Sequence, residues 1–223
     1  MKTKLGLFGK NIELKEIGIQ KGTMIPSFKV IFVGDVCGKT SLLKTLTSGK
    51  YPVNIKATTG VDFYHKLIET NESKINLHIW DIPGGARYGT LCGFYFKQTD
   101  IAIIGFDLTR KVTFTGAMKW LEKINHYLDR DSLGKIILVG LRSDAEPDNE
   151  LDIEALNRFI KDNNLFYMTA SAKAGENMEE LFLQAITLKM EASRLKEETL
   201  ATEETLTTDQ VDVYQSEKGC TVS

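Results

Sequence analysis

Apolar runs alternate with amphipathic stretches along this chain, and both patterns predict regular structure. Three runs are almost continuously apolar, as strands covered on both faces are. They lie at 29–34, 101–106 and 136–139. Residues 60–69 and 75–81 have the β-branched and aromatic composition of strands, and the short polar turn between them predicts a hairpin. A sixth, short strand is expected at 165–170.

Helical periodicity separates most of these strands. Ala117, Leu121, Ile124 and Leu128 recur three or four residues apart, which is the spacing of one buried helix face. Further helices are expected at 39–48, near 151–163 and from Met178 to about Leu188. The order β-α-β-β-α-β-α-β-α-β-α predicts a single α/β domain. Its six-stranded sheet should be mostly parallel, with one antiparallel edge strand and helices on both faces.

Charge and composition set a boundary at each end of this domain. Residues 1–28 hold five lysines and two glutamates, a local charge of +3, and glycines interrupt every helical pattern there. Residues 191–223 hold eight acidic and three basic side chains, a local charge of −5, with few large apolar residues. We therefore expect a basic extension at 1–28, a folded domain at 29–194 and a disordered acidic tail at 195–223.

The totals exclude some classes of function. A net charge of −2 over 223 residues gives no case for nucleic-acid binding. The three cysteines, Cys37, Cys92 and Cys220, are too few for a disulfide framework and suit a reducing compartment. No apolar run has the length of a membrane span. A cytosolic protein is expected, unless a covalent lipid attaches it to a membrane.

The clearest chemical signal is a glycine loop between the first strand and the first helix. It reads Gly34-Asp35-Val36-Cys37-Gly38-Lys39-Thr40-Ser41. The backbone N–H groups of such a loop and the N-terminus of the next helix surround phosphate with positive partial charge. Lys39 would reach the β- and γ-phosphates, and the Thr40 hydroxyl would bind Mg²⁺. Contacts with the nucleotide are expected from Val36, Cys37, Gly38, Lys39, Thr40 and Ser41.

Four further stretches carry related chemistry. They are Thr58-Thr59-Gly60-Val61-Asp62-Phe63, Trp80-Asp81-Ile82-Pro83-Gly84-Gly85, Asp144, and Ser171-Ala172-Lys173. With the glycine loop, these stretches resemble the small GTPases of the Ras superfamily, and the Rab branch best, over about residues 29–190. The resemblance implies a molecular switch that binds GTP or GDP with Mg²⁺ and hydrolyses GTP in vesicle traffic.

The resemblance also implies roles around the phosphates. The Thr58 hydroxyl would reach Mg²⁺ only when the γ-phosphate is present, and Asp81 would hold the Mg²⁺ site through water. The Gly84 N–H would meet the γ-phosphate. Loss of that phosphate would release both segments, which is an order–disorder switch. Lys39, Thr58, Gly84 and Gly85 stand at the family's catalytic positions.

Roles around the base follow in the same way. Tyr51 falls where the family keeps an aromatic side chain against the guanine. Asp144 would accept hydrogen bonds from guanine N1 and N2, and the Ala172 N–H would meet O6. The remaining residues of these two motifs, Arg142, Ser171 and Lys173, would complete the base site.

Three departures from the family pattern change the expectation. The family motif Asn-Lys-x-Asp is Leu141-Arg142-Ser143-Asp144 here, and leucine cannot make the hydrogen bonds of the asparagine. Gly85 stands where a glutamine orients the attacking water, so intrinsic hydrolysis should be slow. The phosphate loop has three residues between its glycines in place of four. A lost charge-assisted hydrogen bond there would cost roughly 1.5–3 kcal/mol in nucleotide affinity.

Partners and alternatives complete the hypothesis. Effectors should bind the switch segments near 58–63 and 84–95, alongside an exchange factor and a GTPase-activating protein. Cys220-Thr221-Val222-Ser223 has the form of a prenylation signal, which would place the protein on the cytosolic face of an intracellular membrane, with the basic extension as a second contact. Two alternatives stay open: a pseudo-GTPase scaffold that binds nucleotide weakly or stays in one state, and a Ran-like transport GTPase.

Overall fold

Six strands form one sheet in the order β2-β3-β1-β4-β5-β6. The structure is a computed structural model that describes residues 25–69, 74–85, 92–128 and 136–216. The strands are β1 (Ser27–Val33), β2 (Asp62–Glu69), β3 (Lys74–Asp81), β4 (Ile101–Asp107), β5 (Ile137–Leu141) and β6 (Phe166–Ala170). All neighbours pair in parallel except β2 and β3, which pair antiparallel at one edge. The mostly parallel sheet with one antiparallel edge strand is therefore confirmed.

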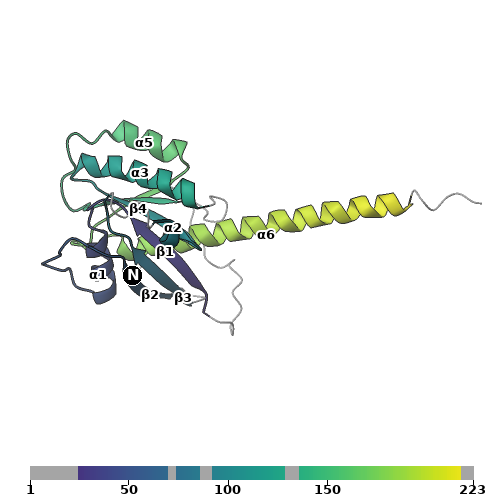
Figure 1. The fold of residues 1–223 in the computed structure, drawn as a ribbon, viewed down its shortest axis with the longest axis horizontal. Coiled ribbons are helices and arrows are strands. Elements are labelled where there is room, and N and C mark those ends of the chain that lie inside the picture. The colour runs from purple at the N-terminus through teal and green to yellow at the C-terminus, as the bar shows by residue number, and fades with distance from the viewer. Residues whose placement is uncertain (1–24, 70–73, 86–91, 129–135, 217–223) are drawn as a thin grey trace, which may run out of the picture.

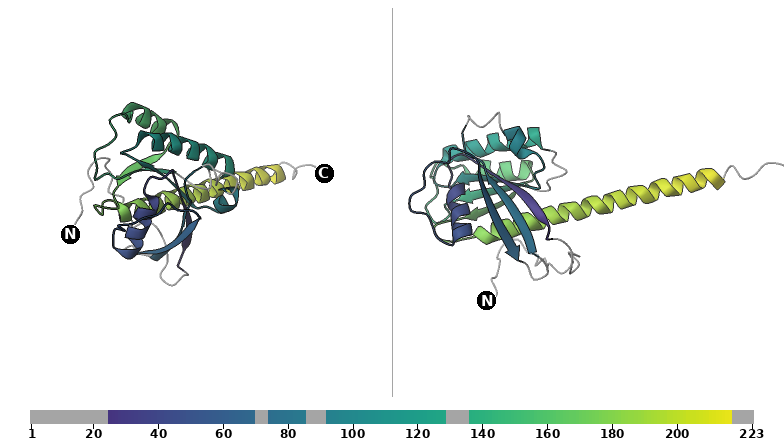
Figure 2. Two further views of the ribbon diagram at one scale, coloured as in Figure 1. Left: turned by 60° about the vertical axis from the view of Figure 1, so that its left-hand side comes forward. Right: turned by 60° about the horizontal axis from the view of Figure 1, so that its bottom comes forward.

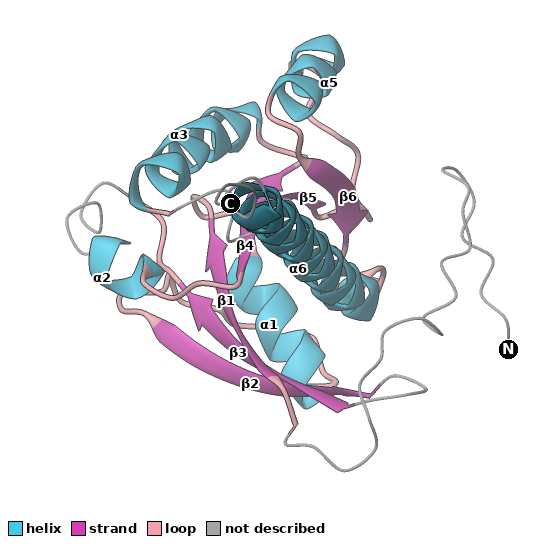
Figure 3. Cartoon of the chain, turned by 90° about the vertical axis from the view of Figure 1, so that its right-hand side faces the viewer, coloured by secondary structure: helices cyan, strands magenta, loops and turns pink. Residues whose placement is uncertain are grey.

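Five helices connect and cover the strands within the described residues. They are α1 (Lys39–Ser48), α2 (Cys92–Phe96), α3 (Lys111–Tyr127), α5 (Ile153–Asp162) and α6 (Met178–Ser216). Figure 3 shows α1 and α6 on one face of the sheet and α2, α3 and α5 on the other. Two clusters of buried side chains follow this division, one beneath α1 and α6 and one beneath α3 and α5. The domain is therefore three layers with a core on each side of the sheet.

The apolar pattern explains why the central strands lie where they do. Every residue of β4 and of β5 is buried, as their continuous apolar runs predict. The predicted stripe of α3 faces the core, with Ala117, Leu121 and Ile124 almost fully covered. Trp120 adds a large buried side chain to this face. These contacts place the ends of β1, β3, β4, β5 and β6 side by side, where the candidate site lies.

The last helix corrects the sequence-based boundary. We expected disorder from residue 195, but α6 continues to Ser216 and is 39 residues long. No glycine or proline occurs between Gly175 and Gly219, and the intervening glutamate, alanine, leucine and lysine residues favour helix. Figures 1 and 2 show the second half of α6 projecting away from the domain. The expectation of a disordered tail is wrong as far as Ser216.

Some sequence-based predictions lie outside the described residues. These are the basic extension up to residue 24, residues 70–73 of the hairpin turn, residues 86–91 of the second switch segment, and Cys220. The folded domain begins slightly earlier than expected, because β1 starts at Ser27. Among the described helices, none combines the length and the apolar character needed to cross a membrane.

Candidate functional site

The glycine loop leaves β1 in a conformation that depends on close packing. We call residues 34–38 the phosphate loop. A Cβ atom at Gly34 would lie only 2.2 Å from the carbonyl oxygen of Gly105 in β4, so the loop leaves the sheet where only glycine fits. Val36 has φ +41°, which is unusual for a β-branched residue, and Gly38 has φ +100° just before α1. The loop with one residue fewer thus reaches α1 with a positive φ at three of its residues, Gly34, Val36 and Gly38.

The Lys39 side chain lies over the phosphate loop. It is 5% exposed, and its Nζ donates a hydrogen bond to the Gly34 carbonyl at 2.7 Å. The same Nζ lies 4.0 Å from Asp81 Oδ1. A buried ammonium over a ring of loop backbone is the arrangement expected for a phosphate-binding lysine.

Two hydroxyls and a carboxylate from three separate elements meet beside Lys39. Thr40 at the start of α1 donates a hydrogen bond to Asp81 Oδ2 at the end of β3. The Thr58 hydroxyl lies 2.8 Å from the Thr40 hydroxyl. The structure therefore brings together the three residues that the sequence assigned to Mg²⁺.

The chemistry of this cluster suits a hard cation. Asp81 is fully buried, and its Oδ1 accepts no hydrogen bond within the described part of the chain. Burial raises the pKa of the Asp81 carboxyl, although the nearby Lys39 charge opposes that shift. Mg²⁺ prefers oxygen ligands, and its charge would compensate a buried carboxylate with a free lone pair. Thr40, Thr58 and Asp81 thus fit a Mg²⁺ ion.

The start of the second switch segment rests against the phosphate loop. A Cβ atom at Gly84 would lie 2.8 Å from the Asp35 Cα and 2.9 Å from the Gly34 carbonyl oxygen. Gly84 therefore brings its backbone directly to the loop, as its predicted role toward the γ-phosphate requires. Gly85 has φ +110°, and its N–H donates a hydrogen bond to Asp35 Oδ1 at 3.1 Å.

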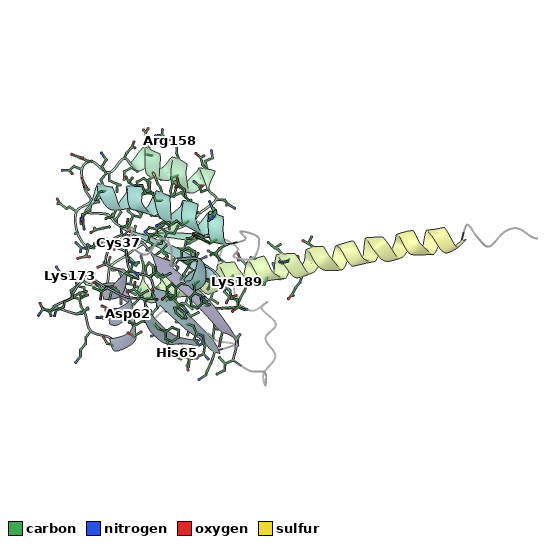
Figure 4. The ribbon with its side chains drawn as sticks, in the orientation of Figure 1. Cys37, Asp62, His65, Arg158, Lys173 and Lys189 are labelled. Atoms are coloured by element: carbon green, nitrogen blue, oxygen red, sulfur yellow. The ribbon has the colours of Figure 1, made fainter. Side chains whose placement is uncertain are left out.

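A cavity of about 280 Å³ adjoins the loop. It holds eight of the residues that the sequence assigned to the nucleotide: Cys37, Gly38, Ser41, Tyr51, Arg142, Asp144, Ala172 and Lys173. Figure 4 labels Lys173 at the end of the domain opposite the projecting part of α6. Leu42, Leu141 and Ala145 complete the lining. The volume and mixed lining suit the base and sugar of a nucleotide.

Ser171 reaches the cavity through another residue. Its hydroxyl donates a hydrogen bond to Asp144 Oδ1 at 2.5 Å and accepts one from the Ala174 N–H at 3.0 Å. These bonds fix the orientation of the Asp144 carboxylate and link the loops after β5 and β6. Val36 is 66% exposed and, like Lys39 and Thr40, is not among the residues that line the cavity.

An ion pair beside the cavity was not predicted from the sequence. Arg142 has φ +63°, and its Nε lies 3.4 Å from Oδ2 of the fully buried Asp107 at the end of β4. Asp107 Oδ1 meanwhile accepts hydrogen bonds from Thr109. The sequence feature that could have indicated this pair is Asp107, an acidic residue at the end of a strand that is otherwise entirely apolar. The pair holds the Arg142 side chain near Gly38 while Leu141 stays buried in β5.

Cys37 packs inside the site. Its side chain is fully buried, and Figure 4 labels it within the body of the domain. Burial is the main cause that raises the pKa of the Cys37 thiol. The structure therefore supports a packing role for Cys37.

Four aromatic side chains form a surface patch next to both switch segments. We call Phe63, Trp80, Phe94 and Tyr95 the aromatic patch. The Phe63 and Trp80 ring centroids are 5.4 Å apart, and those of Trp80 and Tyr95 are 5.9 Å apart. Phe63 and Phe94 are largely exposed. The sequence located both switch segments but not the contact between them across β3.

Known proteins are similar in sequence to most of this chain. A sequence profile described as "Ras family" matches residues 29–191. Human Ras-related protein Rab-30 is 32% identical over 157 residues, which are 70% of this chain and 76% of that protein. Mouse Ras-related protein Rab-12 is 33% identical over 160 residues, which are 71% of this chain and 65% of that protein. The chain therefore belongs to the Ras family and is a Rab-like small GTPase.

Proposed function

We propose that this protein is a guanine-nucleotide switch that depends on Mg²⁺ and recruits effectors to an intracellular membrane during vesicle traffic. The observation that carries the proposal is the meeting of Lys39, Thr40, Thr58 and Asp81 at the mouth of the phosphate loop. Lys39 and Thr40 begin α1, whereas Thr58 and Asp81 lie 18 and 41 residues after Thr40, so the convergence of these three segments supports a phosphate and metal site. Membership of the Ras family supports the same function.

Guanine selectivity would come from Asp144. A carboxylate accepts two hydrogen bonds from the N1 and N2 hydrogens of guanine, whereas adenine offers no such pair. The Ser171 hydroxyl holds that carboxylate in place. Ala172 lines the same cavity, and its N–H would donate a hydrogen bond to guanine O6. Tyr51 and Arg142 line the same cavity and would contact the base or the sugar.

The proposed reaction is hydrolysis of the γ-phosphate. Water forms a bond to the γ-phosphorus and releases a proton to solvent, the bond from this phosphorus to the β–γ bridging oxygen breaks, and GDP and inorganic phosphate leave. Mg²⁺ would neutralise charge on the β- and γ-phosphates, and Thr40, Thr58 and Asp81 would hold it. Lys39 and the Gly84 N–H would stabilise the remaining negative charge.

Intrinsic hydrolysis is proposed to be slow. Gly85 has no side chain to orient the attacking water, and a Cβ atom built at this position contacts nothing within 4 Å. A GTPase-activating protein would supply the missing group, and an exchange factor would release GDP. The aromatic patch supports effector binding, because exposed aromatic clusters are typical anchors of protein interfaces.

Membrane attachment is proposed through a lipid on Cys220. The sequence Cys220-Thr221-Val222-Ser223 supports it, and a single prenyl chain would give reversible attachment to the cytosolic face. The similarity to Rab-30 and Rab-12 favours a Rab-like role over a Ran-like one. Replacing Cys220 with serine should move the protein from membranes to cytosol.

A fixed scaffold is the second candidate. It is favoured by Leu141 in place of the family asparagine, by Gly85 in place of glutamine, and by the shorter phosphate loop. The two candidates differ in whether nucleotide binds and turns over.

One experiment separates these candidates. The purified protein is denatured and the released nucleotide identified, and GDP, GTP and ATP are then titrated with Mg²⁺. The switch requires guanine nucleotide at micromolar affinity or tighter and a measurable single-turnover rate. If no guanine nucleotide binds, the switch is excluded and the scaffold is supported.

A further inference from the structure

Asp35 has a contact set that the proposed mechanism does not use. It belongs to the phosphate loop, yet its carboxylate points to α3 and the second switch segment. Asp35 Oδ1 accepts the Gly85 N–H at 3.1 Å and the Trp120 indole N–H at 2.9 Å. One oxygen atom therefore joins the loop, the second switch segment and α3.

The surroundings of the carboxylate fix its position. Trp120 is 2% exposed and packs in the core beneath α3, so its indole N–H is a rigid donor. Gly116 lies one helical turn earlier, and a Cβ atom there would come within 2.7 Å of Asp35 Oδ2. Glycine at this point of α3 thus leaves the space that the carboxylate occupies. Asp35 is held from the α3 side and can transmit that fixed position to Gly85.

The neighbour of Gly85 is the residue expected to contact the γ-phosphate. Gly84 packs against the Asp35 Cα and the Gly34 carbonyl so closely that no side chain fits there. The hydrogen bond from the Gly85 N–H to Asp35 limits rotation of the peptide group between Gly84 and Gly85. Two consecutive glycines would otherwise be among the most flexible pairs of the chain.

We propose that Asp35 is a positioning residue that keeps Gly84 oriented toward the terminal phosphate. This role rests on the proposed function and deepens it, because the hydrogen bond from Gly85 to Asp35 acts on nucleotide only through the backbone of the second switch segment. We call the hydrogen bond from the Gly85 N–H to Asp35 the tether, and it would favour nucleotides that carry a γ-phosphate. It would add little to GDP, which has no group at that position.

Loss of the Asp35 charge and loss of its acceptor oxygen should change nucleotide affinity in opposite directions. A carboxylate near phosphates repels them, so removing the charge alone should strengthen GDP and GTP binding alike. Removing the acceptor should weaken binding of the triphosphate specifically. Asparagine keeps an acceptor oxygen without the charge, and alanine removes both. Asp35→Asn and Asp35→Ala therefore separate the two effects.

The test compares the affinities of a non-hydrolysable GTP analogue and of GDP in the full-length protein with Mg²⁺. Asp35→Ala should lower the ratio of analogue affinity to GDP affinity by about tenfold, the effect of one weakened hydrogen bond to a charged group. Asp35→Asn should keep the wild-type ratio. Gly116→Ala should reproduce the loss, because the new methyl group displaces the carboxylate while alanine itself favours helix.

Controls distinguish the tether from a general loss of structure. Asp152→Ala removes another carboxylate that accepts a backbone N–H, at the N-terminus of α5, and should leave the ratio unchanged. In nucleotide-free protein, the Gly85 amide should exchange hydrogen faster in Asp35→Ala than in Asp35→Asn. An unchanged ratio in both Asp35→Ala and Gly116→Ala overturns this inference alone. Failure of the wild type to bind guanine nucleotide overturns the proposed function and this role together.

Discussion

Replacing Lys39 with methionine tests whether one lysine supports the fold as well as the phosphate. Its ammonium lies 4.0 Å from Asp81 Oδ1, and both side chains are buried. At that distance and an effective dielectric constant of about 20, the attraction is roughly 4 kcal/mol. Removing one member of a buried pair typically costs about 3–5 kcal/mol, because the other charge stays buried without compensation. We therefore expect Lys39→Met to lower the free energy of unfolding by about 4 kcal/mol.

A second substitution should restore most of this loss. Burial raises the pKa of Asp81, which means that the folded protein disfavours its ionised form. In nucleotide-free protein, Asp81→Asn alone should therefore cost less stability than Lys39→Met, although it leaves the buried Lys39 ammonium without its partner. The double variant, Lys39→Met with Asp81→Asn, should recover most of the stability. Urea unfolding of wild type, both single variants and the double variant, without nucleotide or Mg²⁺, measures this directly.

Nucleotide binding should not recover in the double variant. The lost bond from Lys39 to phosphate is worth roughly 1.5–3 kcal/mol, so GDP affinity should fall by about 10- to 150-fold. Asp81→Asn cannot replace that charge and also removes an oxygen from the Mg²⁺ site. The reasoning is refuted if Lys39→Met unfolds at the wild-type urea concentration, or if the double variant regains GDP affinity.

Three further changes have expected outcomes. Gly85→Gln should speed single-turnover GTP hydrolysis relative to Gly85→Ala. Both variants place a side chain at φ +110°, but only glutamine carries an amide that can orient water. Equal rates in the two variants would contradict this prediction. Ser171→Ala should weaken GDP binding by about 2- to 10-fold, because Asp144 loses the donor that orients its carboxylate. Calorimetry would measure this loss of affinity, and Ser193→Ala on α6 is the control. Burial raises the pKa of Tyr64 to about 12 from 10.0, so the folded state keeps a proton that the unfolded state loses, and stability falls as pH rises from 10 to 12. Tyr64→Phe should remove that part of the alkaline loss in unfolding titrations, and curves parallel to wild type would contradict the assignment.

Local patterns were enough to predict most elements. The first helix occupies the predicted residues 39–48, because a glycine on each side limits it and its apolar positions are periodic. The edge hairpin and the parallel order followed from strand composition and alternation with helices. The loops that follow these strands then had to meet at one end of the sheet, so the assembly of Lys39, Asp81 and Asp144 around one site could be expected.

Contacts between distant side chains could not be predicted in this way. Asp35 and Trp120 are 85 residues apart, and nothing in either segment alone indicates their hydrogen bond. The pairing of Arg142 with Asp107 depends on a left-handed backbone at Arg142, which the sequence does not reveal at a non-glycine residue. Acidic composition alone indicates disorder after residue 194, whereas helix propensity and the absence of glycine and proline favour the helix that α6 continues to Ser216.

The projecting part of α6 changes how a lipid anchor would act. Residues 191–216 form about 26 residues of helix, roughly 39 Å long at 1.5 Å per residue. A flexible chain of that length would let the domain touch the bilayer, whereas a rigid rod holds the domain at one height when it stands upright. The tilt of this helix would therefore set how far a partner must reach from the bilayer to contact the aromatic patch.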